Sequence, residues 1–191
     1  AHRSLFQQEV LAELMPPLEP DGTSHLWEAL GRRYTGLSYA EADRLSKKNK
    51  EFIKGLFPEG VIHATLMSED ARKVIGKTGL QTRGVEKLLR RIGFRYADRV
   101  DPFDGGPHYT ARMDEISLIS NTRRTKADRP FSPTEAETKA IVAIEMNDPP
   151  FFRAMLGPTR DQGARGVVVE DEIWESLSLH HSSPVIVLPI E

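Results

Sequence analysis

The sequence predicts an α+β fold over residues 1–120 and a small β-rich domain over residues 134–191. Between residues 24 and 93, apolar side chains recur at helical spacing behind capping residues, with strand-like runs beside them. After residue 138, short apolar runs alternate with turns rich in proline and glycine, which is typical of a barrel or sandwich. Between these regions the composition becomes polar at residues 121–133, NTRRTKADRPFSP, which predicts a linker.

The first third of the chain predicts one strand and two capped helices. Residues Glu9–Met15 alternate as in a strand that leaves a helix starting upstream, and Pro16–Gly22 predicts a loop. Ser24 can cap a helix that ends near Gly31, and Ser38 with Glu41 forms a capping box for a second helix. The apolar faces are predicted to be Leu26, Trp27 and Leu30 in the first helix and Ala42, Leu45, Phe52, Ile53 and Leu56 in the second.

The remaining elements follow from the same signals. Residues Gly60–Met67, GVIHATLM, read as a strand, and Ser68 can cap a short helix. Thr82 opens a longer helix that Gly93 ends, with Val85, Leu88, Leu89 and Ile92 predicted to face inward. Strands are then predicted at Phe94–Val100 and Tyr109–Met113 as a hairpin, and at KAIVAIEM, FFRAML, GVVVEDEIW and SPVIVLPI in the C-terminal region.

The stretch RVDPFDGGPHY, residues 99–109, cannot be an ordinary strand or helix. Its two prolines fix φ and remove backbone donors, and Gly105 with Gly106 allows positive φ and close backbone approach. It also brings Asp101, Asp104 and His108 into one short segment. Both a plain tight turn and a shaped functional loop fit these residues.

Composition limits the classes of function. The net charge of −2 over 191 residues gives no general reason to expect binding to nucleic acid or to an anionic membrane. The absence of cysteine excludes disulfides and thiolate chemistry and agrees with a reducing cytoplasm, which is the predicted location. No apolar run approaches the roughly 18 residues of a membrane span, and no signal peptide is recognisable.

Several motifs come close to known sites. ARKVIGKT has Ala71 where a phosphate-binding P-loop needs glycine, and it follows a helix where the P-loop follows a strand. RDQGAR and QTRGVE each lack the last small residue of a loop that grips the coenzyme A pyrophosphate, so we interpret them as chance matches. The six histidines show no metal-ligand spacing, and no metal site is predicted. The basic group Arg44, Lys47, Lys48 and Lys50 fits a solvated helix face or a phosphate contact.

Two histidines are candidates for acid–base chemistry, because imidazole titrates near neutral pH. His108 lies beside the Gly-Gly turn, and His63 lies in a predicted strand, where a hydrogen-bonded core histidine is the alternative reading.

The chain resembles the arginine N-succinyltransferase family from about Glu9 to the C-terminus. The resemblance rests on LWEALGRRYTGLSYAEADRLSKKNKEFIKGLFPEG, then VIG, LLRRIGFRY and DPFDGGP, and more faintly on PFFRAML and SPVIVLPI. It implies the C-terminal portion of an acyl-CoA N-acyltransferase-like fold, a mixed sheet with flanking helices, followed by a barrel-like tail. It also implies transfer of a succinyl group from succinyl-CoA, as co-substrate with no permanently bound cofactor, to the α-amine of L-arginine or a related amine such as ornithine, in arginine catabolism.

The resemblance covers little more than the C-terminal half of a family member. The other half would hold most acyl-CoA-binding strands, so we expect a second chain, a cleaved precursor or a partial sequence, and an oligomer. Family members carry a proposed general-acid histidine after VIG, where this chain has Gly79. Glycine cannot transfer a proton. His108 and His63 are therefore the predicted catalytic substitutes, and Asp101, Asp104, Gly105 and Gly106 the predicted substrate-binding residues.

Two other readings stay open at this point. Gly79 and the missing pyrophosphate loop favour a non-catalytic or regulatory subunit that completes an acyltransferase partner. A cleavage fragment whose tail mainly makes oligomer contacts is the third.

Overall fold

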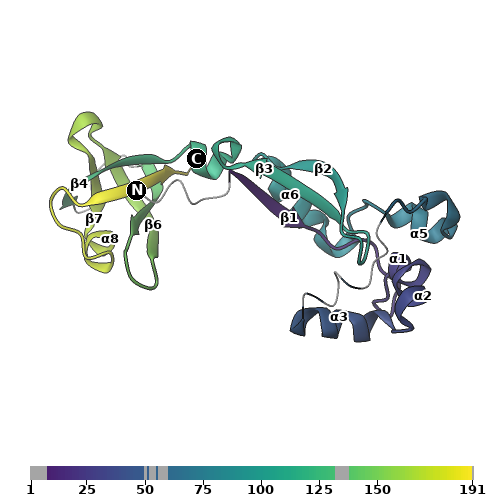
Figure 1. Cartoon of the computed structure of the whole chain (residues 1–191). Coiled ribbons are helices and arrows are strands. Elements are labelled where there is room, and N and C mark those ends of the chain that lie inside the picture. The colour runs from purple at the N-terminus through teal and green to yellow at the C-terminus, as the bar shows by residue number, and fades with distance from the viewer. Residues whose placement is uncertain (1–7, 50, 52–54, 56–59, 132–137, 191) are drawn as a thin grey trace. The chain divides into compact units, whose positions relative to one another are not determined.

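The computed structural model describes residues 8–49, 51, 55, 60–131 and 138–190. The chain divides into two compact units, Ala1–Ile116 and Ser117–Glu191. The first contains a three-stranded sheet with helices, and the second a closed five-stranded barrel (Figure 1). The protein is therefore a mixed α/β protein with a barrel-like C-terminal part.

Unit 1 is built around an antiparallel sheet in the order β1-β3-β2. Its strands are β1 (Glu9–Glu13), β2 (Arg95–Val100) and β3 (Pro107–Arg112). Its helices are α1 (His25–Ala29), α2 (Gly31–Thr35), α3 (Tyr39–Lys48), α5 (Glu69–Val74) and α6 (Arg83–Arg91), with the 3₁₀ turns η2 (Ala64–Leu66), η3 (Leu80–Thr82) and η4 (Met113–Glu115).

Helix α6 lies against one face of this sheet (Figure 1). Alternate residues of β3 point to that face, so Tyr109 and Ala111 are buried while His108 and Thr110 point to the other side. The core under α6 comprises Leu14, Phe94, Tyr109, Ala111 and Ile116, with Ala12, Leu89 and Ile92 packed around them.

A second, aromatic cluster joins the helices to the turn between β2 and β3. Trp27 is fully buried, and its ring centroid lies 4.6 Å from that of Phe103 in the turn. Tyr39 at the start of α3 completes the cluster, with its ring 5.4 Å from Phe103. A Cβ on Gly31 would lie 2.2 Å from a Trp27 ring carbon, so the close approach of α2 to this ring requires glycine. The cluster fixes the turn against α1 and α3.

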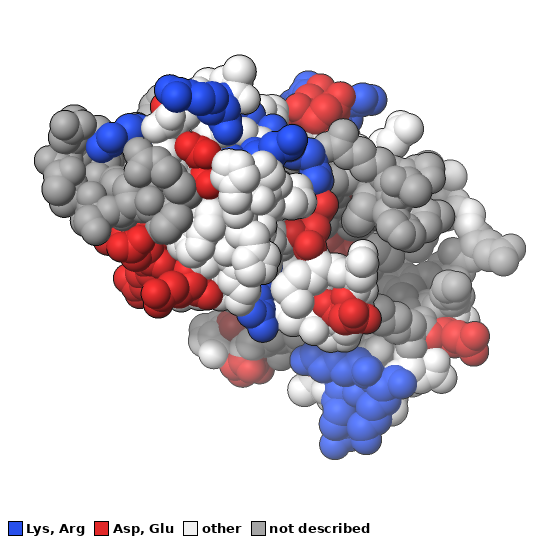
Figure 2. Space-filling model, turned by 90° about the vertical axis from the view of Figure 1, so that its left-hand side faces the viewer, with Lys and Arg blue, Asp and Glu red and all other residues white. Residues whose placement is uncertain are grey.

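Unit 2 closes its barrel in the order β4-β7-β6-β5-β8. Charged side chains of both signs are interspersed on the face shown in Figure 2. Val142, Val167, Val169 and Ile173 form its core. The elements are α7 (Ser117–Ser120), β4 (Arg123–Phe131), β5 (Thr138–Glu145), β6 (Phe152–Asp161), η5 (Gly163–Arg165), β7 (Val167–Glu170), α8 (Asp171–Ser176) and β8 (Pro184–Pro189).

Most locally encoded elements are confirmed. The Ser24 and Ser68 caps, the Ser38–Glu41 capping box and the β2–β3 hairpin form as predicted. The strand at the start of the chain and four C-terminal strands also form. Phe52, Ile53, Leu56 and any helix upstream of residue 8 lie outside the described residues.

The strand predicted at residues 60–67 is wrong. This segment contains the 3₁₀ turn η2, and Val61 and Leu66 are 84% and 85% exposed. An apolar run forms a strand where another strand pairs with it, and none of the described strands pairs with this one. Helix α1 ends at Ala29, near Gly31 as predicted, and Gly31 opens α2. Two smaller predictions fail: Val85 and Leu88 are exposed, and GVVVEDEIW divides into β7 and α8.

The polar linker predicted at 121–133 is also wrong over Arg123–Phe131, which form β4 and close the barrel. The hydrophobic signal is weak because the strand is rich in charged residues, although Ala127 is fully buried in the core. Backbone pairing with β7 and β8 holds it. Ion pairs join Arg123 to Asp161 and Arg124 to Glu145, each at 2.7 Å, so these charges are compatible with a strand.

Among the helices in the described part of the chain, none has the length and apolar character needed to cross a membrane.

Replacing Ser24 with alanine should destabilise unit 1 by about 1–3 kcal/mol. The Ser24 hydroxyl is fully buried, accepts from the Trp27 N–H at 3.2 Å and donates to the Asp104 carbonyl at 3.1 Å, so its loss leaves two polar groups unpaired. Urea unfolding can be followed by Trp27 fluorescence in a Trp174→Phe background, since the chain has 2 tryptophans. Ser46→Ala, which removes only a local bond to the Asp43 carbonyl, is the control and should change stability by less than about 0.5 kcal/mol.

Candidate functional site

The turn between β2 and β3 is closed by its own backbone. The Asp101 N–H donates to the Gly106 carbonyl and the Gly105 N–H to the Asp101 carbonyl, both at 2.8 Å. Each carboxylate accepts a backbone N–H two residues on, Asp101 from Phe103 at 2.9 Å and Asp104 from Gly106 at 2.7 Å. Both aspartates therefore shape the turn, and each uses one carboxylate oxygen, Oδ1, to do so.

The two glycines of this turn are buried. Gly105 has a φ of +86°, and a Cβ on Gly106 would lie 2.2 Å from the Leu14 carbonyl oxygen, so both positions favour glycine on backbone grounds. Their N–H groups are occupied within the turn. The packing explains both residues, and a role for them in substrate binding stays a prediction.

His108 lies directly after this turn, on the sheet face away from α6. It pairs across the sheet with Glu13 of β1, and its Nε2 lies 3.6 Å from Glu13 Oε1. The imidazole is largely buried, and Nε2 is the buried side-chain atom that lacks a hydrogen-bond partner among the described residues. A buried polar atom without a partner is uncommon, and this marks His108 as a candidate functional residue.

Three carboxylates influence one another at the β2–β3 turn and the end of β1. Burial raises the pKa of Asp104 to about 6, the Gly106 N–H opposes this shift, and the charges of Asp101 and Glu13 add to it. Those contributions mean that Asp101, Asp104 and Glu13 act on one another electrostatically. The corner is therefore suited to a cationic group such as an amine or guanidinium.

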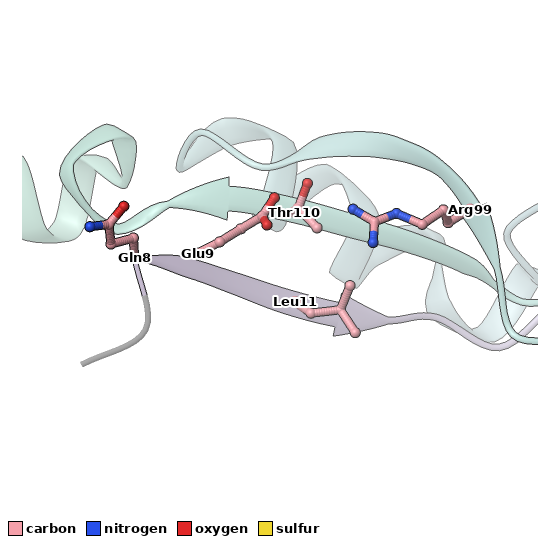
Figure 3. Close-up of a pocket in the computed structure, with 5 residues that line it drawn as sticks. All are labelled: Gln8, Glu9, Leu11, Arg99 and Thr110. Atoms are coloured by element: carbon pink, nitrogen blue, oxygen red, sulfur yellow. The ribbon is translucent and has the colours of Figure 1, made fainter. Parts of the chain in front are cut away.

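The open face of the sheet continues from this corner into a hollow of about 400 Å³. Figure 3 shows Arg99 extending toward Thr110, with Leu11 on the neighbouring strand and Glu9 and Gln8 toward the far end. Glu9, Leu11 and Glu13 share this face because residues two apart on a strand point the same way. The hollow thus adds one cation, one hydroxyl and further carboxylate charge to the face that carries His108.

Position 79, where the family resemblance places a histidine, is closed by main chain. A Cβ on Gly79 would lie 2.5 Å from the Pro16 carbonyl oxygen and 2.9 Å from its carbonyl carbon. The Gly79 N–H donates to the Met15 carbonyl at 2.8 Å, and Thr82 Oγ1 donates to the same oxygen at 3.0 Å. These bonds hold the segment after α5 against the end of β1, so the backbone leaves no room for a side chain there.

A polar network beside this segment was not predicted from the sequence. Glu86 Oε1 accepts from the Tyr109 hydroxyl and from Arg90 Nε, each at 2.8 Å, and Arg90 Nη2 donates to the Tyr109 oxygen. Hydrogen bonds from Thr78, Arg90 and Tyr109 lower the pKa of Glu86 to about 2. The Glu86–Arg90 spacing of four residues was the only signal for it in the sequence. The network fastens α6 and residue 78 to β3.

The structure does not bring the two candidate histidines together. His63 is exposed before η2, and no hydrogen bond or ion pair joins it to the turn among the described residues. Asp101 and Asp104 share the turn, and Glu13, from a strand that is distant in sequence, acts electrostatically on Asp104 and lies 3.6 Å from His108 Nε2. Register is a tertiary property, so no local pattern signals this pairing. Within the described ranges no cluster of three or more His, Asp or Glu side chains could hold a metal ion.

The pKa of Asp104 predicts a pH dependence for unit 1. Because the folded carboxyl binds its proton at a higher pH than the unfolded one, the folded state holds more protons between about 3.8 and 6. The free energy of unfolding should therefore fall as pH rises from 4 through about 6. Asp104→Asn keeps the acceptor for the Gly106 N–H and removes the charge, so urea unfolding from pH 4 to pH 7 should show a smaller fall. Equal pH slopes for the two proteins would contradict this origin.

Gly79→Ala should destabilise unit 1 by about 1–3 kcal/mol, because the new methyl group meets the Pro16 backbone. Gly84→Ala is the matched control, since nothing lies within 4 Å of its Cβ position and it is in α6. The control should raise stability by about 0.5–1 kcal/mol. Thermal unfolding of both variants measures the difference. Equal stability of the two variants would contradict the conclusion that the Pro16 backbone leaves no room for a side chain at position 79.

Comparisons with known proteins identify relatives of this chain. A family model described as arginine N-succinyltransferase beta subunit matches residues 1–118. The arginine N-succinyltransferase of Enterobacter sp. (strain 638) is 36% identical over 158 residues, which cover 82% of this chain and 45% of that protein. That of Citrobacter koseri is 32% identical over 181 residues, covering 94% and 52%. The chain spans about half the length of these curated relatives.

A solved structure shows the same fold. The arginine/ornithine succinyltransferase subunit AI from Pseudomonas aeruginosa superposes with a TM-score of 0.75 at 24% identity, over 100% of this chain and 53% of that one. The family model matches well over half of the chain, and with it the resemblance found in the sequence is confirmed. The chain belongs to the arginine N-succinyltransferase beta subunit family.

Proposed function

We propose that this chain forms the arginine-binding half of an arginine N-succinyltransferase. The reaction transfers the succinyl group of succinyl-CoA to the α-amine of L-arginine, and residues 1–120 are the acyltransferase-like part. The remaining half of the fold, which the longer relatives contain, would bind the acyl-CoA. Membership of the family supports the reaction, and the acidic corner supports a cationic amine as the substrate.

The observation that carries the proposal is the buried Nε2 of His108, which has no hydrogen-bond partner among the described residues and lies 3.6 Å from Glu13 Oε1. A guanidinium or ammonium group attracts carboxylates strongly, and in this proposal Asp101 and Asp104 bind it. His108 then lies where it can take a proton from the bound amine. Glu13 Oε1 lies 3.6 Å from this nitrogen.

The chemical step needs no nucleophilic side chain. The neutral amine attacks the thioester carbonyl, a C–N bond forms, and the C–S bond then breaks. The amine proton passes to His108 Nε2, and the departing thiolate leaves as coenzyme A after taking up a proton. The absence of cysteine is compatible with this direct transfer.

A second function is favoured by the closed backbone at Gly79. A chain without a side chain at the family's acid position could complete or regulate an acyltransferase partner without catalysing. The two functions differ in where the proton-transfer group resides. In the first it is His108, and in the second it lies on the partner.

His108→Gln should lower kcat for arginine succinylation by about 100-fold, because the base is lost and the size of the side chain is roughly kept. Release of free thiol from succinyl-CoA measures turnover, and the chain contributes no thiol of its own because it has no cysteine. L-arginine and L-ornithine should be compared as acceptors. The assay uses the chain alone and together with whatever succinyltransferase half accompanies it in its source.

His180→Gln is the matched control, because His180 is exposed in unit 2. His63→Gln tests the other predicted histidine in the same assay. Thiol release by the isolated chain would exclude the non-catalytic function. Full activity of the His108→Gln variant in the assembled enzyme would exclude the catalytic one.

A further inference from the structure

The strand β2 contains a bulge opposite His108. The aligned pairs on either side of the bulge are Tyr96 with Tyr109 and Val100 with Pro107. Between these pairs β3 has one residue, His108, whereas β2 has three, residues 97–99. The backbone at the centre of the bulge has a φ of +51°, at Asp98. Because a bulge bends its strand and redirects side chains, the extra residues bring Arg99 next to the proposed base in the ladder.

Arg99 differs from the other arginines of β2 and β3 in having no partner among the described residues. On the same strands, Arg95 pairs with Glu115, and Arg112 pairs with Asp114 at 3.0 Å. Arg99 is exposed, and no hydrogen bond or ion pair joins it to the described part of the chain. Its guanidinium therefore keeps all of its N–H donors for a bound molecule.

The hollow on the open face of the sheet receives this side chain. Figure 3 shows Arg99 extending toward Thr110, with Leu11 beside them on β1 and Glu9 toward the far end. Thr110 follows His108 by two residues, so both side chains point to the same face of β3. A guanidinium and a hydroxyl are hydrogen-bond donors that suit a carboxylate. The volume of about 400 Å³ is within the range of small-ligand sites.

We propose that Arg99 binds a substrate carboxylate in this hollow and determines specificity for it. The inference rests on the proposed function, and both substrates of that reaction carry a carboxylate. One is the α-carboxylate of L-arginine, and the other is the distal carboxylate of the succinyl group. A guanidinium holds a carboxylate through two parallel N–H···O bonds, and such a pair fixes the orientation of the ligand as well as binding it.

The position of Arg99 favours the α-carboxylate of the amino acid. The α-amine and the α-carboxylate are attached to the same carbon atom. A carboxylate site next to His108 therefore keeps the amine near the proposed base. The charges agree with this direction of binding, since the turn supplies Asp101 and Asp104 for the cationic side chain of arginine and the hollow supplies Arg99 for its anionic end.

Arg99→Gln tests the subsite through pairs of substrates that differ in one carboxylate. Agmatine is arginine without its α-carboxylate, and butyryl-CoA has a methyl group where succinyl-CoA has its carboxylate. The ratio of kcat/KM for L-arginine to that for agmatine should fall by at least about 10-fold in the variant, mainly through KM. Damage to the fold would lower the rates with both acceptors and leave their ratio unchanged.

The acyl donors identify which carboxylate is bound. With the α-carboxylate in the hollow, the ratio of kcat/KM for succinyl-CoA to that for butyryl-CoA stays unchanged in Arg99→Gln. A fall in this second ratio alone would keep the carboxylate subsite and assign it to the succinyl group. If neither ratio falls, the inference is wrong.

Two further variants control for charge and for the strand. Arg95→Gln removes an arginine of the same strand whose guanidinium is already paired, and it should leave both ratios within about 2-fold of the wild type. Arg99→Lys keeps the charge and loses the two-pronged geometry, so it should restore part of the preference for L-arginine. Urea unfolding of each variant should match the wild type, because Arg99 is exposed.

Binding decides if neither the chain nor its assembly transfers succinyl groups. The NMR signal of the Arg99 Nε–H, assigned by its loss in Arg99→Gln, is followed in the 191-residue chain. L-Arginine should shift this signal and agmatine should not, and succinate with butyrate is the corresponding pair for the other carboxylate. A shift with L-arginine or succinate alone would keep the subsite and count against the proposed function. The absence of a shift with both would overturn the subsite.

Discussion

Unit 1 depends on the close backbone contact between Gly106 and the end of β1. A Cβ at Gly106 would lie 2.2 Å from the Leu14 carbonyl oxygen, so the approach exists only with glycine. The same contact region holds the bond from the Leu14 N–H to the Pro107 carbonyl at 3.1 Å, which sets the register of β1 against β3. The register in turn places Glu13 opposite His108. A packing constraint of two backbones thus determines which carboxylate lies near the candidate base.

Alternate side chains of β3 point to opposite faces of the sheet, one facing the core and the other carrying the candidate site. Tyr109 and Ala111 enter the core under α6, and Tyr109 also anchors the network with Glu86 and Arg90. His108 and Thr110 point to the open face, where no described helix covers them. Because one strand serves both faces, any slip in register would exchange them. The network on the helix side therefore helps to keep His108 on the open face.

Sequence patterns predicted what is encoded within a few residues. The Ser24 and Ser38 caps and the β2–β3 hairpin depend on neighbours close in the chain, and all formed. The approach of Glu13 to His108 spans a long sequence separation and leaves no local pattern. The strand β4 was missed because pairing with β7 and β8 outweighs its polar composition.

Misassigned burial has a different origin. Val85 and Leu88 satisfy a helical apolar stripe in the sequence, yet both are exposed. The pattern correctly reports a surface that is suited to burial, which stays exposed among the described residues. The same reasoning applies to the apolar residues of β1. Disagreement between a strong pattern and the observed exposure therefore marks a surface suited to an interface.

The position of Gly79 connects the chemistry to this division of the fold. The Pro16 backbone fills the space a side chain would need, and Met15 binds the Gly79 N–H and the Thr82 hydroxyl. The same bonds occupy the Met15 carbonyl just beyond the end of β1. This one contact therefore leaves no room for a side chain at position 79, and it also ends the part of β1 whose backbone is unpaired. The acidic corner lies on the neighbouring part of the sheet, where Glu13 of β1 pairs with His108 of β3. The backbone contacts at the end of β1 therefore shape both position 79 and the surroundings of His108.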